Sequence, residues 1–265
     1  DEPGEAAQRY AREIVSLLSE RTPEGFAFRV DLRLRPASEV SPLAVSLPAA
    51  LTHYESSALA WERAAFIRAR PAAGDIRGGE EFLRAIRPFV WRSSLDFGAI
   101  IEMGRLSAKI RDSNEGPDAV GPGFDLKKGR GGIREIEFFV QIHQLIHGGR
   151  EPALRVRGTR EALDSLARAG RIEADDADRL GAAYDRLRVI EHRLQMVGDQ
   201  QTHSIPADAE AIAGIAALDG SDDAEALLDE LSDLTGDVAR RYDSLLDTLS
   251  GEPDDRSGTK PLSRQ

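Results

Sequence analysis

From residue 49 onward, apolar residues recur at the spacing of three to four that places them on one face of a helix. This pattern predicts helices at 49–69, 79–90, 94–112, 132–147, 158–169, 174–198, 207–217 and 222–249, after an earlier helix at 5–20. A loop at 113–131, rich in Gly and Pro, divides the later helices into two groups. The chain is therefore predicted to be mainly α-helical, with a helical bundle over residues 49–250.

One segment departs from the helical period. In residues 26–35 (FAFRVDLRLR) apolar and polar side chains alternate, which is typical of a β-strand with one buried face. A second, shorter strand is predicted at 43–47, before Pro48. Two strands alone do not form a stable sheet, so we expect either a hairpin packed on the bundle or pairing with strands from outside this chain. The predicted domains are a β-containing unit at 1–48, the bundle, and a disordered tail at 251–265.

Composition excludes several classes of protein. The 265 residues include no cysteine, which excludes disulfides, thiol catalysis and thiolate metal sites. No apolar run approaches the roughly 20 residues that span a bilayer. Residues 1–150 carry 21 basic and 21 acidic side chains and residues 151–265 carry 14 and 25, so the second part holds the whole net charge of −11. Phosphate contacts dominate nucleic-acid affinity, so a chain of this negative charge is not expected to bind nucleic acid. The missing cysteines and the missing apolar run favour a soluble, cytoplasmic protein with no membrane partner.

The polar face of the predicted strand at 26–35 is the first candidate site. It places one carboxylate, Asp31, between Arg29 and Arg33, with Arg35 on the same face. Transfer of phosphoryl or nucleotidyl groups needs carboxylate oxygens to hold Mg²⁺ and cations to neutralise phosphate oxygens. These residues supply both, although the same pattern also fits a solvated strand face with ion pairs.

The second candidate is the sequence KKGRGG at 127–132, directly before the helix predicted from residue 132. Glycines in front of a helix leave backbone N–H groups available to an anion, and Lys128 and Arg130 would add positive charge. The spacing matches neither a dinucleotide-binding motif nor a P-loop, so a connector loop is an equal alternative.

Two predicted helices carry a line of polar residues between apolar stripes. In 132–147 the line is Arg134, Glu137, Gln141 and Gln144, and in 174–198 it is Asp185, Arg188, His192, Gln195 and Asp199. A polar line on a buried helix must find partners or face a cleft, so the two lines either pair with each other or form a site wall. The candidate cleft-lining residues are Lys128, Arg130, Arg134, Glu137, Gln141, Arg188 and His192. His143 and His147 lie four residues apart, a spacing that can hold a metal ion, but His143 is on an apolar stripe and is interpreted as a core histidine.

A series of sequence blocks resembles one known family. The blocks FRVDLRLRP, SPLAVSLPA, AWERAAFIRARP, LRAIRPFVWR, LDFGAI, KKGRGGIREIEFFVQIHQLIHGGREPALR and EHRLQMVGDQQTHSIP follow in this order. They are similar to bacterial bifunctional glutamine synthetase adenylyltransferase/adenylyl-removing enzymes, and the wording is that of the N-terminal, adenylyl-removing half. The resemblance covers roughly residues 5–206.

The resemblance implies the last strands of a nucleotidyltransferase palm, followed by a helical bundle like that of the PII uridylyltransferases. The implied activity is removal of AMP from an adenylyl-tyrosine of glutamine synthetase by phosphate and Mg²⁺, with release of ADP. Glutamine synthetase, the PII signal protein, ATP or ADP, and phosphate are the implied partners. Two alternatives stay open: a regulatory helical module that binds PII or glutamine synthetase, and a nucleotidyltransferase with another acceptor.

The resemblance also assigns site residues. Asp31 matches the late metal-binding carboxylate of the palm and is the implied catalytic residue, while Arg33, Arg35, Arg68 and Arg70 match basic positions that hold nucleotide and phosphate. The family's Asp-x-Asp pair precedes this region and is not in the chain. We therefore expect the chain to be part of the adenylyl-removing unit and to be inactive alone.

Overall fold

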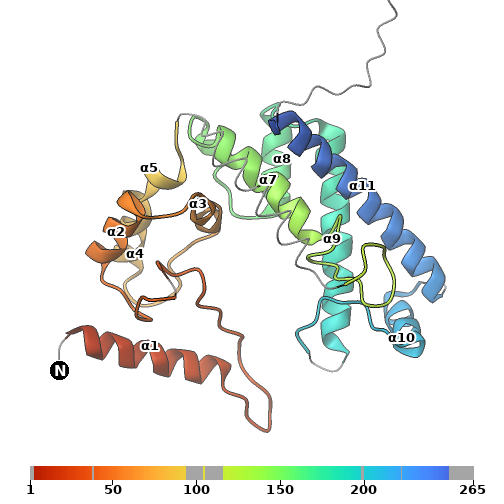
Figure 1. Cartoon of the computed structure of the whole chain (residues 1–265), viewed down its shortest axis with the longest axis horizontal. Coiled ribbons are helices and arrows are strands. Elements are labelled where there is room, and N and C mark those ends of the chain that lie inside the picture. The colour runs from red at the N-terminus through yellow and green to blue at the C-terminus, as the bar shows by residue number, and fades with distance from the viewer. Residues whose placement is uncertain are drawn as a thin grey trace, which may run out of the picture. The chain divides into compact units, whose positions relative to one another are not determined.

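The computed structural model describes residues 3–37, 39–93, 104, 116–197, 200–221 and 223–250, and its contacts divide the chain into units at 1–92 and 93–265 (Figure 1). Within these ranges the regular structure is helical, which confirms the mainly α fold. None of the helices in the described ranges has the length and apolar character of a membrane-spanning segment. The predicted tail and, apart from residue 104, the predicted helix at 94–112 lie outside the described residues, and the domain limits at 48 and 250 stay predictions.

The first unit contains α1 (Pro3–Ser19), α2 (Leu47–Ser56), α3 (Ala60–Ile67), α4 (Ile76–Ala85) and α5 (Arg87–Val90). Its core is built on aromatic contacts around Tyr54, whose ring lies 4.8 Å from that of Phe66 and 5.5 Å from that of Phe89. Ala50, Ile86 and Val90 complete the buried cluster. The helices α2 and α5 therefore pack together at one small aromatic core.

Two predicted helices are each divided in the structure. The prediction at 49–69 is wrong in joining α2 to α3, because the Glu62 carboxylate accepts the backbone N–H of Leu59 at 2.9 Å and starts a new helix there. The prediction of one helix at 79–90 is also wrong, because the structure has two helices there, α4 and α5. Pro88 cannot donate the backbone hydrogen bond that would continue α4, so the helix ends at Ala85.

The predicted strands at 26–35 and 43–47 are wrong as regular elements. Residues 26–35 are irregular chain after a turn held by Thr22 and Gly25, and Leu47 already belongs to α2. A strand exists through backbone hydrogen bonds to a neighbour, and no segment in the described ranges pairs with either stretch. Phe28 and Leu34, expected on a buried face, are accordingly 67% and 59% exposed.

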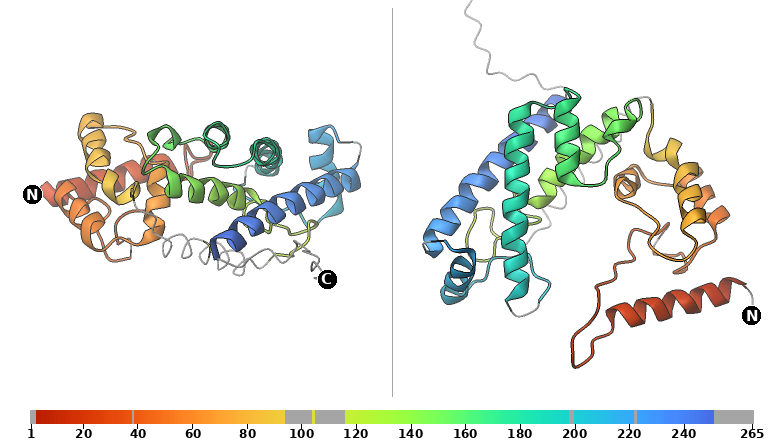
Figure 2. Two further views of the ribbon diagram at one scale, coloured as in Figure 1. Left: turned by 90° about the horizontal axis from the view of Figure 1, so that it is seen from above. Right: turned by 180° about the vertical axis from the view of Figure 1, so that it is seen from behind.

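The second unit contains the longer helices. They are α7 (Ile133–His147), a short 3₁₀ turn (Pro152–Leu154), α8 (Thr159–Arg168), α9 (Ala174–Met196), α10 (Ala209–Asp219) and α11 (Ala224–Ser250). α9 packs against α8, α7, α10 and α11, and α7 also contacts α11 (Figure 2). All five α-helices agree with predicted helices to within a few residues, which confirms the bundle in this part of the chain.

α7 is the most deeply embedded helix of this unit. Ile133, Ile136 and Ile142 have no exposed surface, as both apolar stripes of the sequence predict. Gln144, which the sequence placed on the polar line, is also buried and donates to the backbone oxygens of Leu154 and Val156 at 2.7 and 2.9 Å. This side chain therefore holds the turn after α7 rather than facing a cleft.

Candidate functional site

The segment with Asp31 forms a local ion pair in the first unit. The guanidinium of Arg33 donates to both carboxylate oxygens of Asp31, with Nη2 2.6 Å from Oδ2 and Nε 3.0 Å from Oδ1 and Oδ2. These hydrogen bonds lower the pKa of Asp31 to about 2, helped by the positive charges of Arg33 and Arg29. Because the two side chains are 42% and 81% exposed, the pair contributes little to stability and remains open to a ligand.

The other predicted basic residues of this unit have different settings. Arg35 donates to the backbone oxygens of Leu32 and Ser41 at 2.9 and 3.3 Å, so it holds the turn that follows the Asp31 segment. Arg68 is the C-terminal capping residue of α3, and Arg70 lies two residues further on. Both are exposed. The structure thus brings Asp31 and Arg33 into contact and leaves Arg68 and Arg70 accessible on another element of the same unit.

The donor set around Asp31 fits one corner of a Mg²⁺ site. Mg²⁺ in phosphate-transferring enzymes is held by one or two carboxylates together with water and substrate oxygens, and an exposed carboxylate at Asp31 has this character. Within the described ranges, no group of three or more His, Asp or Glu side chains is placed to enclose a metal ion. An exposed carboxylate such as Asp31 has the chemistry of one ligand of such a site, and this role stays a prediction.

The loop before α7 satisfies its own backbone groups. Asp125 accepts the amides of Lys127 and Lys128 at 2.8 Å through one carboxylate oxygen, and Glu135 accepts the amide of Gly131 at 2.9 Å. Backbone oxygens accept the amides of residues 129 and 132–135. These N–H groups are not available to an anion, so any anion at this loop would have to bind to side chains.

Glu191 on α9 is a buried carboxylate with two charged neighbours, and its residue is 1% exposed. Its Oε2 accepts from Arg188, and its Oε1 lies 2.7 Å from Nδ1 of His203. Burial opposes ionisation of Glu191, but the His203 contact and the positive charges of Arg188 and Lys127 outweigh it and lower the pKa. The structure thus places part of the KKGRGG loop, α9 and the segment at 202–205 around one carboxylate.

The remaining predicted cleft residues lie around the same loop and helices. Arg130 forms an ion pair with Asp243 of α11 at 2.7 Å, and Nη2 of Arg188 lies 3.3 Å from Nε2 of His192. Lys128 is exposed, and the α7 side chains Arg134, Glu137 and Gln141 are half-buried. Their role as a cleft wall stays a prediction.

Sequence reasoning missed Asp125, Glu191 and His203 as members of this arrangement. For Glu191 a signal was present, because it lies four residues after Leu187 and three before Leu194, both of them buried. A carboxylate at a core position of an amphipathic helix must have a buried cationic or hydrogen-bonding partner. Asp125 and His203 gave no such periodic signal, since both lie in loops.

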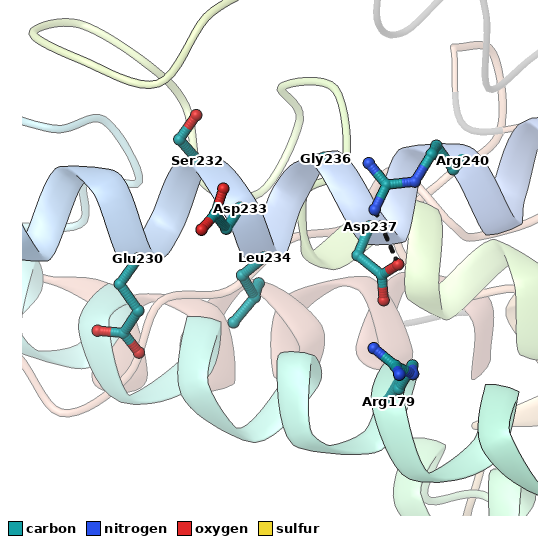
Figure 3. A pocket seen from close by; sticks show the side chains of 8 residues that line it. All are labelled: Arg179, Glu230, Ser232, Asp233, Leu234, Gly236, Asp237 and Arg240. Carbon is teal, nitrogen blue, oxygen red and sulfur yellow. Dashed lines mark hydrogen bonds and ion pairs between the residues drawn. The ribbon is translucent and has the colours of Figure 1, made fainter.

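A groove of about 480 Å³ runs between α9 and α11 on another part of this unit (Figure 3). Its lining is mostly charged, and Arg240 spans one turn of α11 to donate to Asp237 at 3.0 Å. The lining residues are Arg179, Glu230, Ser232, Asp233, Leu234, Gly236, Asp237 and Arg240. None of the predicted site residues lines this groove.

Comparison with known proteins connects both units to nucleotidyltransferases. The family model described as glutamate-ammonia ligase adenylyltransferase matches residues 2–85, which include Asp31, and the model described as GlnD PII-uridylyltransferase matches residues 104–246, which include the bundle. The chain therefore combines a segment similar to the adenylyltransferase model with a segment similar to the uridylyltransferase model. It belongs to the GlnD PII-uridylyltransferase family, whose model covers more than half of it.

Its similar relatives within this class are bifunctional glutamine synthetase adenylyltransferase/adenylyl-removing enzymes. The enzyme of Agrobacterium fabrum is 45% identical over 95% of the chain, and that of Bradyrhizobium diazoefficiens is 44% identical over 98%. The Caulobacter vibrioides enzyme is 48% identical over 83% of the chain. The chain spans 26%, 26% and 22% of these three proteins, about a quarter of each. The resemblance derived from the sequence blocks is thus confirmed.

Proposed function

We propose that this chain is part of an enzyme that controls glutamine synthetase by reversible adenylylation. The proposal rests on identity of 44–48% to bifunctional enzymes of that name over most of the chain. The wording of the blocks GGIREIEF and HGGREPALR favours the adenylyl-removing unit. The enzyme would act in the cytoplasm, with adenylylated glutamine synthetase and phosphate as substrates.

In the proposed reaction, an oxygen of inorganic phosphate attacks the phosphorus of the adenylyl group. The bond to the tyrosine oxygen breaks, the tyrosine takes up a proton, and ADP leaves. Bound Mg²⁺ would supply positive charge to the phosphate oxygens. Asp31 would be the ligand that this chain contributes, and Arg33, Arg35, Arg68 and Arg70 would hold phosphate groups through their guanidinium N–H groups.

The Asp31–Arg33 pair is compatible with these roles. Both side chains are accessible, and Arg33 can leave a solvent-exposed carboxylate at small cost because surface ion pairs are weak. Release of Arg33 would expose two carboxylate oxygens to a metal and one guanidinium to a phosphate. The bundle would then shape the groove that receives the protein substrate.

The test is the variant Asp31→Ala in the longer protein that contains this chain. Loss of a metal ligand should reduce ADP release by at least about a hundredfold, on the order of 3 kcal/mol in transition-state stabilisation. The fold and the melting temperature should stay unchanged, because Asp31 is exposed. The matched control is Glu39→Ala, which removes a nearby carboxylate outside the RVDLRLRP segment. Full activity of the Asp31 variant would contradict the assignment.

A second function is supported by the match of residues 104–246 to the GlnD PII-uridylyltransferase model. In this function the bundle would act chiefly as an interaction module for the PII protein or for glutamine synthetase. Capture of purified PII or purified glutamine synthetase by this chain would support that function. A nucleotidyltransferase with another protein acceptor is distinguished by testing acceptors with the longer enzyme.

A further inference from the structure

Three parts of the sequence meet at one place in the second unit. The backbone N–H of Leu126 donates to the oxygen of His203 at 2.8 Å, and Ile205 donates to the oxygen of Phe124 at 2.9 Å. These bonds fix the start of the KKGRGG loop beside the segment at 203–205. His203 in turn contacts Glu191 on α9. Because Leu126 is bonded to His203, the next residue, Lys127, lies close to α9, the helix that carries Arg188.

The cations at this place exceed what the neighbouring carboxylates can neutralise. Arg188 is bound to Glu191 but is still 35% exposed, so its remaining N–H groups reach solvent. Neither lysine ammonium of the loop pairs with a carboxylate in the described part of the chain. Asp125, the nearby acid, is occupied by the two lysine amides.

This cluster stands out against its surroundings. Residues 151–265 carry 25 acidic and 14 basic side chains, and only four lysines occur in the whole chain. Two of these four are Lys127 and Lys128. Like charges repel one another, so such a cluster lowers its energy by binding an anion.

We propose that Lys127 and Arg188, with Lys128 at the rim, form a binding site for a phosphate group on the second unit. Glu191 is a positioning residue in this site, since it holds Nη1 of Arg188 from the buried side while part of the guanidinium stays exposed to solvent. Guanidinium and ammonium groups are the side chains that bind phosphate most strongly. The site uses side chains because the loop amides are already bonded, and it does not depend on the proposed function.

Phosphate binding is measured on the chain itself by NMR, from the imidazole signals of His192 and His203, which lie beside Arg188 and Glu191. Inorganic phosphate and ADP are titrated separately at constant pH and ionic strength, with chloride as the reference anion. We expect saturable shifts of both histidines. The ligand with the higher affinity shows whether the site binds free phosphate or the phosphate groups of a nucleotide.

The variants are chosen so that the fold is preserved. Lys127→Gln keeps the backbone and should weaken binding at least about tenfold, whereas Arg188→Lys keeps the charge that Glu191 requires and should weaken it less. Arg240→Gln on α11 is the control and should bind as the wild type does, because Arg240 lines the other groove. Unsaturable shifts, unchanged binding by Lys127→Gln, or a preference for a poly-glutamate peptide over both phosphate ligands would overturn the proposal.

Discussion

Buried charged groups in this molecule are held by specific partners. Glu191 is 1% exposed and has Arg188 and His203 as its neighbours, and Glu62 is 5% exposed with the ring of His53 at 3.0 Å. Removing one partner of such a pair leaves the other charge without compensation. These two carboxylates therefore have structural roles in joining segments, whereas Asp31 lies at the surface in an exposed pair with Arg33.

His143 gives a pH-dependent contribution to stability. Burial lowers its pKa from the ordinary 6.5 to about 4, with a smaller effect of His147, and its ring contacts that of Phe139 at 4.8 Å. Between these pH values the unfolded chain binds a proton that the folded chain does not. The contribution of neutral His143 is complete above pH 6.5 and is lost as the pH falls toward 4.

The expected size of this loss is on the order of 2–3 kcal/mol at pH 4. It is measured as the free energy of unfolding against pH for the wild type and for His143→Phe, which retains an aromatic ring. The variant should lose less stability than the wild type between pH 7 and pH 4. His192→Gln, at an exposed position, should behave as the wild type does. Equal acid sensitivity of the His143 variant would contradict the buried, neutral state.

The loop before α7 is held by direct contact with α11. Gly131 has φ of 71°, in the left-handed region, and a Cβ there would overlap the backbone oxygen of Thr235 in α11. The loop therefore packs directly on the backbone of α11. Arg130 adds an ion pair to the same helix through Asp243.

Gly131→Ala should be strongly destabilising, by about 3 kcal/mol or more, because strain in the backbone adds to an overlap that only movement of α11 can relieve. Gly170→Ala is the matched control. Its φ is 65°, but nothing lies within 4 Å of the added Cβ, so only the backbone cost of about 1 kcal/mol applies. Denaturant unfolding separates the two. Equal losses would show that the contact with Thr235 does not matter.

The helices of the second unit were predictable because each carries its own periodic stripe and local caps. Asp208 and Asp223, for example, accept the amides of Ala211 and Ala226 at 2.9 and 2.8 Å at the starts of α10 and α11. The predicted strand at 26–35 failed because a strand depends on a partner distant in sequence. The expectation of available amides in the KKGRGG loop was wrong for a different, local reason, because the nearby side chains of Asp125 and Glu135 accept several of them.

At the scale of the whole molecule, two compact units correspond to two family models. The unit at 1–92 contains the whole adenylyltransferase match at 2–85, and the unit at 93–265 contains the uridylyltransferase match at 104–246. The sequence blocks predicted this assignment because a block is recognised from the order of its residues, whether or not the segment forms a strand. The sequence did not predict that the residues around Glu191 lie together, because contacts between loops have no periodic pattern.

The central claim is that this chain contributes to removal of AMP from glutamine synthetase. It is tested most directly by ADP release from adenylylated glutamine synthetase with phosphate and Mg²⁺, comparing this chain with the longer protein that contains it. We expect release by the longer protein and none by this chain, in which Asp31 is the carboxylate proposed to bind the metal. Release by this chain alone would contradict the metal-site argument, and no release by the longer protein, with its regulatory ligands present, would contradict the proposed function.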